Sequence, residues 1–69
     1  MISKNQVDKL LAKLKAKKSL TVIYDKFIEP RKLSMNGSKI MYSVDENTFE
    51  ITMDGLSVVI DNAKDIHEH

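Results

Sequence analysis

His67 and His69 are the two histidines of the chain and its best candidates for a metal ligand or a proton carrier. On a strand, their i, i+2 spacing would place both rings on one face, but a metal ion needs further ligands from elsewhere. Cysteine is absent, so no thiolate can supply them. The pair is better explained as a solvated tail or as the remnant of a purification tag. We therefore expect no bound metal.

Catalysis requires a nucleophile, a base and an orienting group held together, and the chain offers few candidates. The neighbouring carboxylates Asp45 and Glu46 fall in a predicted turn, where nothing indicates the burial that acid or base chemistry would need. Gly37 and Gly55 are isolated turn residues and do not form a phosphate-binding loop. We therefore expect no catalytic residues and no cofactor, and a protein that binds a partner rather than an enzyme.

The charges of the chain are strongly separated along the sequence. Residues 1–39 carry ten basic and three acidic side chains, a net charge of +7, whereas residues 40–69 carry one basic and seven acidic side chains, a net charge of −6. This asymmetry favours a polyanionic partner for the basic half, or head-to-tail pairing of copies. A solvated helix face rich in lysine, followed by an ordinary acidic surface, would give the same pattern.

Four lysines close together in the basic half, Lys13, Lys15, Lys17 and Lys18, could contact the phosphates of a nucleic acid. Lysines near the end of a helix also interact favourably with the helix dipole, so the cluster does not by itself require a ligand. Aromatic rings that face outward could stack on unpaired bases. The aromatic residues are Tyr24, Phe27, Tyr42 and Phe49. Together these side chains predict a nucleic-acid-binding surface.

The most regular apolar spacing predicts a helix over about residues 4–17. Its apolar face is marked by Val7, Leu10, Leu11 and Leu14. Ser3 and Gln6 have the spacing of a capping box at its start.

Later segments have the composition of strands. Residues 20–28 and 39–44 are rich in β-branched and aromatic side chains, and residues 48–54 alternate between apolar and polar. Pro30 ends the first of these strands because it cannot donate to a sheet ladder. Asp54-Gly55 predicts a hairpin leading into an apolar strand over 56–60. A last short strand or turn follows over 64–67.

These elements predict one α+β domain over residues 1–69, with a four- to five-stranded antiparallel sheet over about residues 20–66. Apolar residues on both faces of the first strand indicate a strongly bent sheet, as in a small barrel. A domain of this size buries only about 60% of its unfolded surface, so association of copies would add stability. No apolar run approaches the roughly 18 residues that span a bilayer. We expect a cytoplasmic protein without membrane contact.

Residues 11–24 contain paired leucines, a basic cluster and a strand ending in Ile-Tyr, and residues 59–66 contain a strand, a tight turn ending in Ala and a last strand. The first segment resembles the Hfq-like RNA chaperones within the Sm-like proteins, and the second is similar to the second Sm motif of that family. Thr48-Phe49 stands where that family has a Gln-Phe pair. The chain departs from the family at Asp61-Asn62, where a Lys-His pair is expected. The segment over residues 29–36 is also longer than the corresponding segment of the family.

The resemblance implies an Sm-like or SH3-like small barrel, a ring of copies that pair edge to edge, and single-stranded RNA as the ligand. It further implies that Lys15 and Lys18 form a basic rim, that Tyr24 stacks on bases at one face, and that Phe49 stacks near the pore on the other.

Two other kinds of function fit the same residues. A small regulator or inhibitor of the phage or mobile-element type could engage a host protein through its acidic half or an exposed sheet edge. A DNA-binding protein could contact phosphates through the lysine-rich helix, although no helix-turn-helix or zinc finger is visible.

Overall fold

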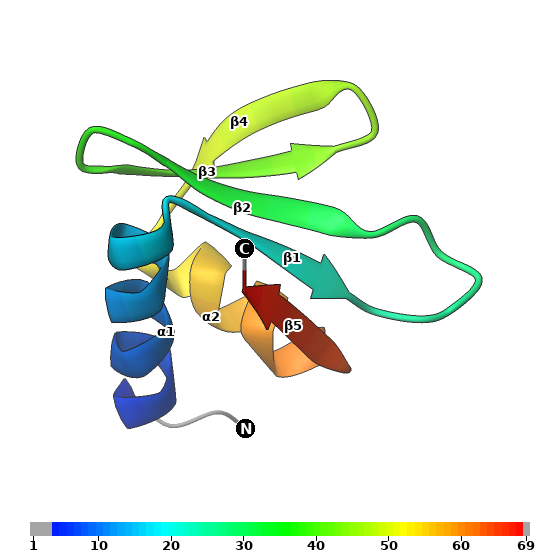
Figure 1. Ribbon diagram of the computed structural model, residues 1–69, viewed down its shortest axis with the longest axis horizontal. Helices are drawn as coiled ribbons and strands as arrows, with labels where there is room; N and C mark the ends of the chain where they lie inside the picture. Colours follow the sequence, from blue (N-terminus) through cyan, green and yellow to red (C-terminus); the bar gives the residue numbers. More distant parts are fainter. Residues whose placement is uncertain (1–3, 69) are drawn as a thin grey trace.

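The computed structural model describes residues 4–68 of the chain. Its elements follow one another as α1 (Lys4–Lys17), β1 (Ser19–Ile23), β2 (Arg31–Asn36), β3 (Lys39–Val44), β4 (Asn47–Ile51), α2 (Met53–Asn62) and β5 (Asp65–Glu68). The strands form one antiparallel sheet in the order β4-β3-β2-β1-β5, and both helices lie against the same side of it (Figure 1). The predicted α+β class with an antiparallel sheet is confirmed.

Helix α1 has the bounds that the apolar spacing predicts. Val7, Leu10 and Leu14 are buried on its inner face. The helix ends because Lys18 takes a left-handed conformation (φ 72°), and its N–H donates to the carbonyl of Leu14 at 2.8 Å. The predicted capping box includes Ser3, which lies outside the described residues.

The first strand is shorter than the predicted 20–28, because the chain turns at Asp25. A carboxylate oxygen of Asp25 accepts the N–H of Phe27 at 3.0 Å, and its carbonyl accepts the N–H of Ile28 at 3.1 Å. Asp25 therefore replaces the strand ladder as the acceptor for these N–H groups. Phe27 and Ile28 lie in the loop between β1 and β2 instead of in a strand.

Strand β2 occupies a segment for which the sequence indicates only a turn on either side. It pairs with β1 through Leu20 and Leu33, and with β3 through Leu33 and Tyr42. Strand β2 is the central strand of the sheet, and its Leu33 is fully buried. Strands β3 and β4 agree with their predicted positions, except that β4 ends at Ile51.

The predicted hairpin at Asp54-Gly55 and the strand over 56–60 are wrong, because residues Met53–Asn62 form helix α2. The hydroxyl of Thr52 accepts the N–H of Gly55 at 3.0 Å and caps the start of the helix. Leu56 and Val59 are spaced for one helical face, and both are buried. Gly55 does not take the positive φ that the predicted turn would need.

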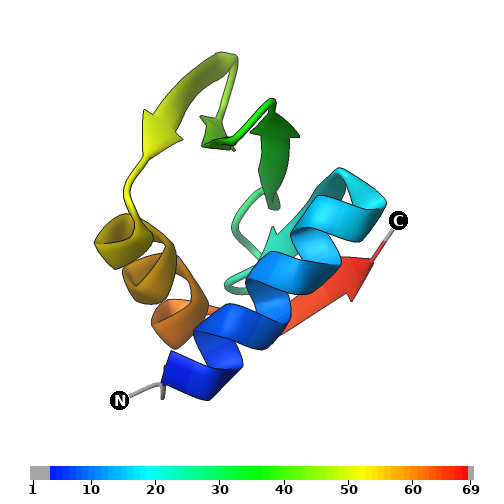
Figure 2. The ribbon, with the colours of Figure 1, turned by 90° about the vertical axis from the view of Figure 1, so that its left-hand side faces the viewer.

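Strand β5 pairs with β1, with Ile66 opposite Val22, and this leaves β4 and β5 as the two edges of the sheet. Within residues 4–68 no ladder joins these edges, and α2 connects them, so the sheet is open rather than a closed barrel. Figure 2 shows the sheet curving over the two helices.

One apolar core fills the space between the sheet and the helices. Its buried members are Val7, Leu10, Leu14, Leu20, Val22, Leu33, Ile40, Leu56 and Val59. Both helices contribute to it, so α2 is an integral part of the fold. Among the helices of residues 4–68, none has the length and apolar character needed to cross a membrane.

Candidate nucleic-acid interface

Three of the lysines predicted to bind nucleic acid remain together at the end of α1. Lys15 and Lys17 lie in its last turn, Lys18 follows it, and all three side chains are exposed. The negative end of the helix dipole favours these cations and stabilises the turn that carries them.

The structure adds Lys39 to these lysines, which the sequence did not indicate. The carbonyl of Lys18 accepts the N–H of Met35 at 3.1 Å, and Met35 lies opposite Ile40, the residue that follows Lys39. Two strand spacings, roughly 10 Å, therefore separate Lys18 from the start of β3. We call Lys15, Lys17, Lys18 and Lys39 the basic end.

The basic end carries no internal counter-charge within residues 4–68. None of its four ammonium groups lies within 4 Å of a carboxylate in that part of the chain. Lys13 differs, because its ammonium lies 3.6 Å from the carboxylate of Glu68 on β5. Lys13 therefore belongs to the contact between α1 and β5 rather than to the basic end.

Tyr24 does not join the lysines. It follows the last residue of β1, about 20 Å along the strand direction from Lys18. Its hydroxyl lies 2.8 Å from that of Tyr42, and its ring packs against the core. Burial, followed by this hydrogen bond, raises the pKa of Tyr24 well above its ordinary value of 10.0. Tyr24 therefore connects two strands. Much of its ring surface is covered, which argues against the predicted role in stacking on bases.

Phe49 keeps an accessible ring. It lies on the edge strand β4 opposite Tyr42, and the two rings meet edge to face with centroids 5.8 Å apart. The side chain remains 46% exposed. Lys39 and Phe49 are about three residues apart along neighbouring strands, roughly 10 Å. Of the two predicted stacking residues, Phe49 is the one that can receive a base.

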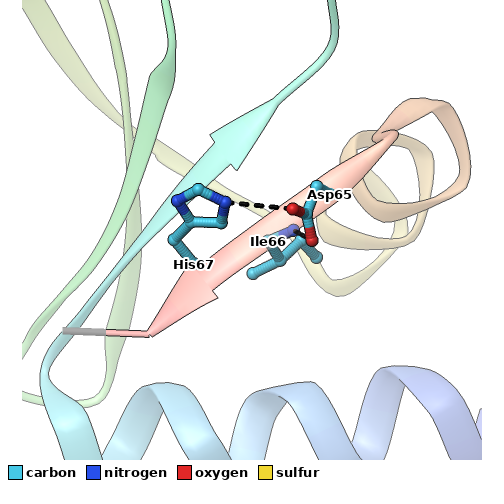
Figure 3. A network of polar contacts seen from close by, with 3 residues as sticks. All are labelled: Asp65, Ile66 and His67. Carbon is cyan, nitrogen blue, oxygen red and sulfur yellow. Dashed lines mark hydrogen bonds and ion pairs between the residues drawn. The ribbon is translucent and has the colours of Figure 1, made fainter.

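His67 forms a polar pair that the sequence reasoning missed. Its Nε2 lies 3.0 Å from a carboxylate oxygen of Asp65, two residues earlier on β5 (Figure 3). The pair is exposed, and residues 4–68 contain no group of three side chains suited to hold a metal ion. His69 lies outside the described residues.

Comparison with protein families, curated proteins and solved structures found no match. The structure itself adds one observation about the Sm-like resemblance. Val59 and Ile60, which the resemblance assigns to a strand, lie in α2. The interpretation of the site therefore depends on its own geometry.

Proposed function

We propose that the chain binds single-stranded RNA through phosphate contacts at the basic end. The proposal depends on the position of Lys39, which the sheet places close to the three lysines at the end of α1. Among residues 4–68, no carboxylate lies within 4 Å of these four ammonium groups. Four exposed cations with no carboxylate within 4 Å among residues 4–68 attract a polyanion, because binding releases the counterions condensed on its backbone.

Phe49 favours a single strand over a duplex as the ligand. Its half-exposed ring lies on the edge strand β4, and Lys39 projects from the opposite face of the sheet, so an unpaired base of a strand that passes around this edge could stack on the ring. A base held within a duplex is stacked on its neighbours and is not available for such contact.

The free sheet edges support the ring of copies that the Sm-like resemblance implies. Among residues 4–68, strands β4 and β5 each pair on one side alone, and pairing of β4 with β5 of the next copy would extend the sheet from subunit to subunit. Such pairing would also bring several basic ends together in one assembly.

Fluorescence anisotropy with a labelled oligouridylate tests the proposal. Four lysine contacts predict a slope of about −3 in a plot of log K against log salt. Lys39→Gln should weaken binding roughly fourfold at physiological salt and reduce the slope by about 0.7. The matched control is Lys9→Gln, which removes the same charge from α1 outside the basic end and should leave both quantities unchanged.

Three results would argue against this proposal. Equal effects of Lys39→Gln and Lys9→Gln would show that only overall charge matters. Tighter binding of duplex DNA than of the oligouridylate would favour the DNA-binding alternative. No binding at low salt would exclude nucleic acid altogether.

The unpaired β4 edge favours a protein-binding regulator as the second candidate. All residues of β4 except Ile51 are exposed, so a strand from another protein could pair with it directly. This function predicts no binding to the oligouridylate and loss of partner binding when Thr48→Pro removes an N–H from β4. It becomes the leading interpretation if the anisotropy experiment shows no binding.

A further inference from the structure

One face of the sheet points away from both helices, and we call it the outer face (Figure 1). In the part of the chain that the structure describes, no helix covers it. Side chains alternate along a strand, so the neighbours of the buried Leu20, Leu33 and Ile40 lie on this face. On the three middle strands, lysine and hydroxyl side chains are prominent there, including Thr21, Lys32, Ser34, Lys39 and Ser43.

Two lysines of the outer face are open to a ligand. Lys32 and Lys39 are both exposed. Neither ammonium lies within 4 Å of a carboxylate among residues 4–68. Within the same residues, the three middle strands place no carboxylate on this face. The middle of the outer face is therefore positive.

The carboxylates of the outer face lie at its edges. Glu50 is on β4 and Asp65 is on β5, each two strands from β2 or roughly 10 Å away. That distance is about one Debye length at about 0.1 M salt, so their repulsion of a ligand over β2 is largely screened. Asp45, in the turn after β3, lies 4.0 Å from Arg31 on the opposite face of β2.

The outer face is continuous with the basic end, because Lys39 belongs to both. Lys39 lies opposite Asn36 at the end of β2, and Lys32 is four residues from Asn36, roughly 13 Å along the strand. Ser34 lies between the two lysines on the same face. Its hydroxyl can donate to a phosphate oxygen. A chain of phosphates bound at Lys39 can therefore follow β2 to Lys32.

We propose that a single RNA strand bound at the basic end continues along the outer face of β2 and places a further phosphate on Lys32. This inference rests on the proposed RNA binding and adds the path of the strand to it. Charge complementarity favours this occupant, since Lys32 extends the basic end to five cations.

The shape of the positive area favours one backbone over two. Three strands give it a width of roughly 10 Å, and the acidic edge strands limit it on both sides. The second backbone of a duplex would lie over Glu50 or Asp65. Ladders on both sides hold β2 in place, so the protein loses little conformational entropy when the strand binds.

Fluorescence anisotropy with a labelled oligouridylate of about 16 nucleotides tests the path. With Lys32 as a fifth contact, the slope of log K against log salt should be about −3.5, steeper than the value of about −3 for the basic end alone. Lys32→Gln should weaken binding roughly fourfold at physiological salt and return the slope to about −3. The matched control is Lys26→Gln, which removes the same charge from the loop at the same end of the sheet and should change neither quantity.

A second variant tests the middle of the path. Ser34→Glu places a carboxylate between the two lysines and should weaken binding at least as much as Lys32→Gln, because both change the charge of the outer face by one. Ser34→Thr keeps the hydroxyl and should bind like the native chain. Circular dichroism shows whether the variants fold, and Lys32→Gln decides the matter alone if Ser34→Glu does not.

The failure of this path is distinct from a failure of RNA binding. The path is overturned if Lys39→Gln weakens binding but Lys32→Gln does not, if Lys32→Gln and Lys26→Gln act alike, or if a folded Ser34→Glu binds like the native chain. RNA binding at the basic end is retained in each of these cases. No binding of the oligouridylate at low salt would instead overturn the proposed function and the path with it.

Discussion

The hydroxyl groups of Tyr24 and Tyr42 lie 2.8 Å apart and join the end of β1 to β3 across the intervening strand β2. Either hydroxyl can donate this hydrogen bond. Tyr42 in turn meets Phe49 on β4 edge to face, so three aromatic rings connect three strands of the sheet. These contacts therefore link the end of β1 to the edge strand β4.

Removing either hydroxyl should destabilise the fold without affecting RNA binding. Tyr24→Phe and Tyr42→Phe each lose one partly buried hydrogen bond, which costs about 1 kcal/mol in the free energy of unfolding. Because both changes break the same bond, the double variant should cost clearly less than the sum of the two. Urea unfolding measures these values. Strict additivity would show that the hydroxyls do not interact.

The stability of the fold should decrease in alkaline solution because of Tyr24. Its pKa is raised in the folded state, first by burial and then by the bond to Tyr42, above the ordinary value of 10.0. The neutral ring therefore contributes stability that is complete below the unfolded pKa and is lost as the pH rises through the folded pKa. Urea unfolding between about pH 9 and about pH 11 should show a steeper loss in the native chain than in Tyr24→Phe. Equal slopes would contradict this assignment.

The start of α2 should depend on the hydroxyl of Thr52. Thr52→Ala removes the acceptor for the N–H of Gly55 and should lower the free energy of unfolding by about 1 kcal/mol, whereas Thr52→Ser keeps the acceptor and should have little effect. Urea unfolding followed by far-ultraviolet circular dichroism measures both. Equal stability of the two variants would favour the hairpin that the sequence suggested.

Lys18 should show opposite effects on stability and on binding. Its left-handed backbone favours glycine, so Lys18→Gly should raise the free energy of unfolding by about 0.5–1 kcal/mol. The same change removes one cation from the basic end and should weaken binding to the oligouridylate. Lys17→Gly is the control, because Lys17 is helical and glycine there should destabilise the fold. A gain in RNA affinity for Lys18→Gly would remove Lys18 from the proposed interface.

The sequence could predict those elements whose apolar periodicity is complete within one short segment of the chain. Val7, Leu10 and Leu14 have the spacing of one helical face, which does not fit the two-residue period of a strand, and α1 has the predicted bounds. Alternation around Phe49 likewise predicts β4. The strand has no buried face, however, and only Ile51 is half-buried, because β4 is an edge strand of the sheet.

Helix α2 shows why short apolar runs are ambiguous. Five residues, Leu56–Ile60, fit a buried strand and a helix turn equally well, and Asp54-Gly55 favoured the wrong alternative. Thr52 was the contrary signal, since a threonine three residues before a glycine N–H can cap a helix. Only packing against the core, where Leu56 is fully buried, selects the helix.

The candidate site was predictable only in part for a related reason. Lys15, Lys17 and Lys18 are neighbours in the sequence, and their common location follows from one helix. Lys39 joins them through the contact of Lys18 with Met35, a long-range hydrogen bond that no local pattern contains. Tyr24 was separated from the lysines because β1 carries it to the opposite end of the sheet.

The pairing of β5 with β1 also sets the order in which the molecule can be completed during synthesis. Leu20 and Val22 leave the ribosome early, but their partners Glu68 and Ile66 emerge only after every other strand. Until then one side of β1 has unpaired N–H and carbonyl groups, which is the condition in which strands pair with the wrong chain. The nascent chain therefore passes through a stage in which β1 is open, and Asp65–Glu68 end that stage when they close the ladder.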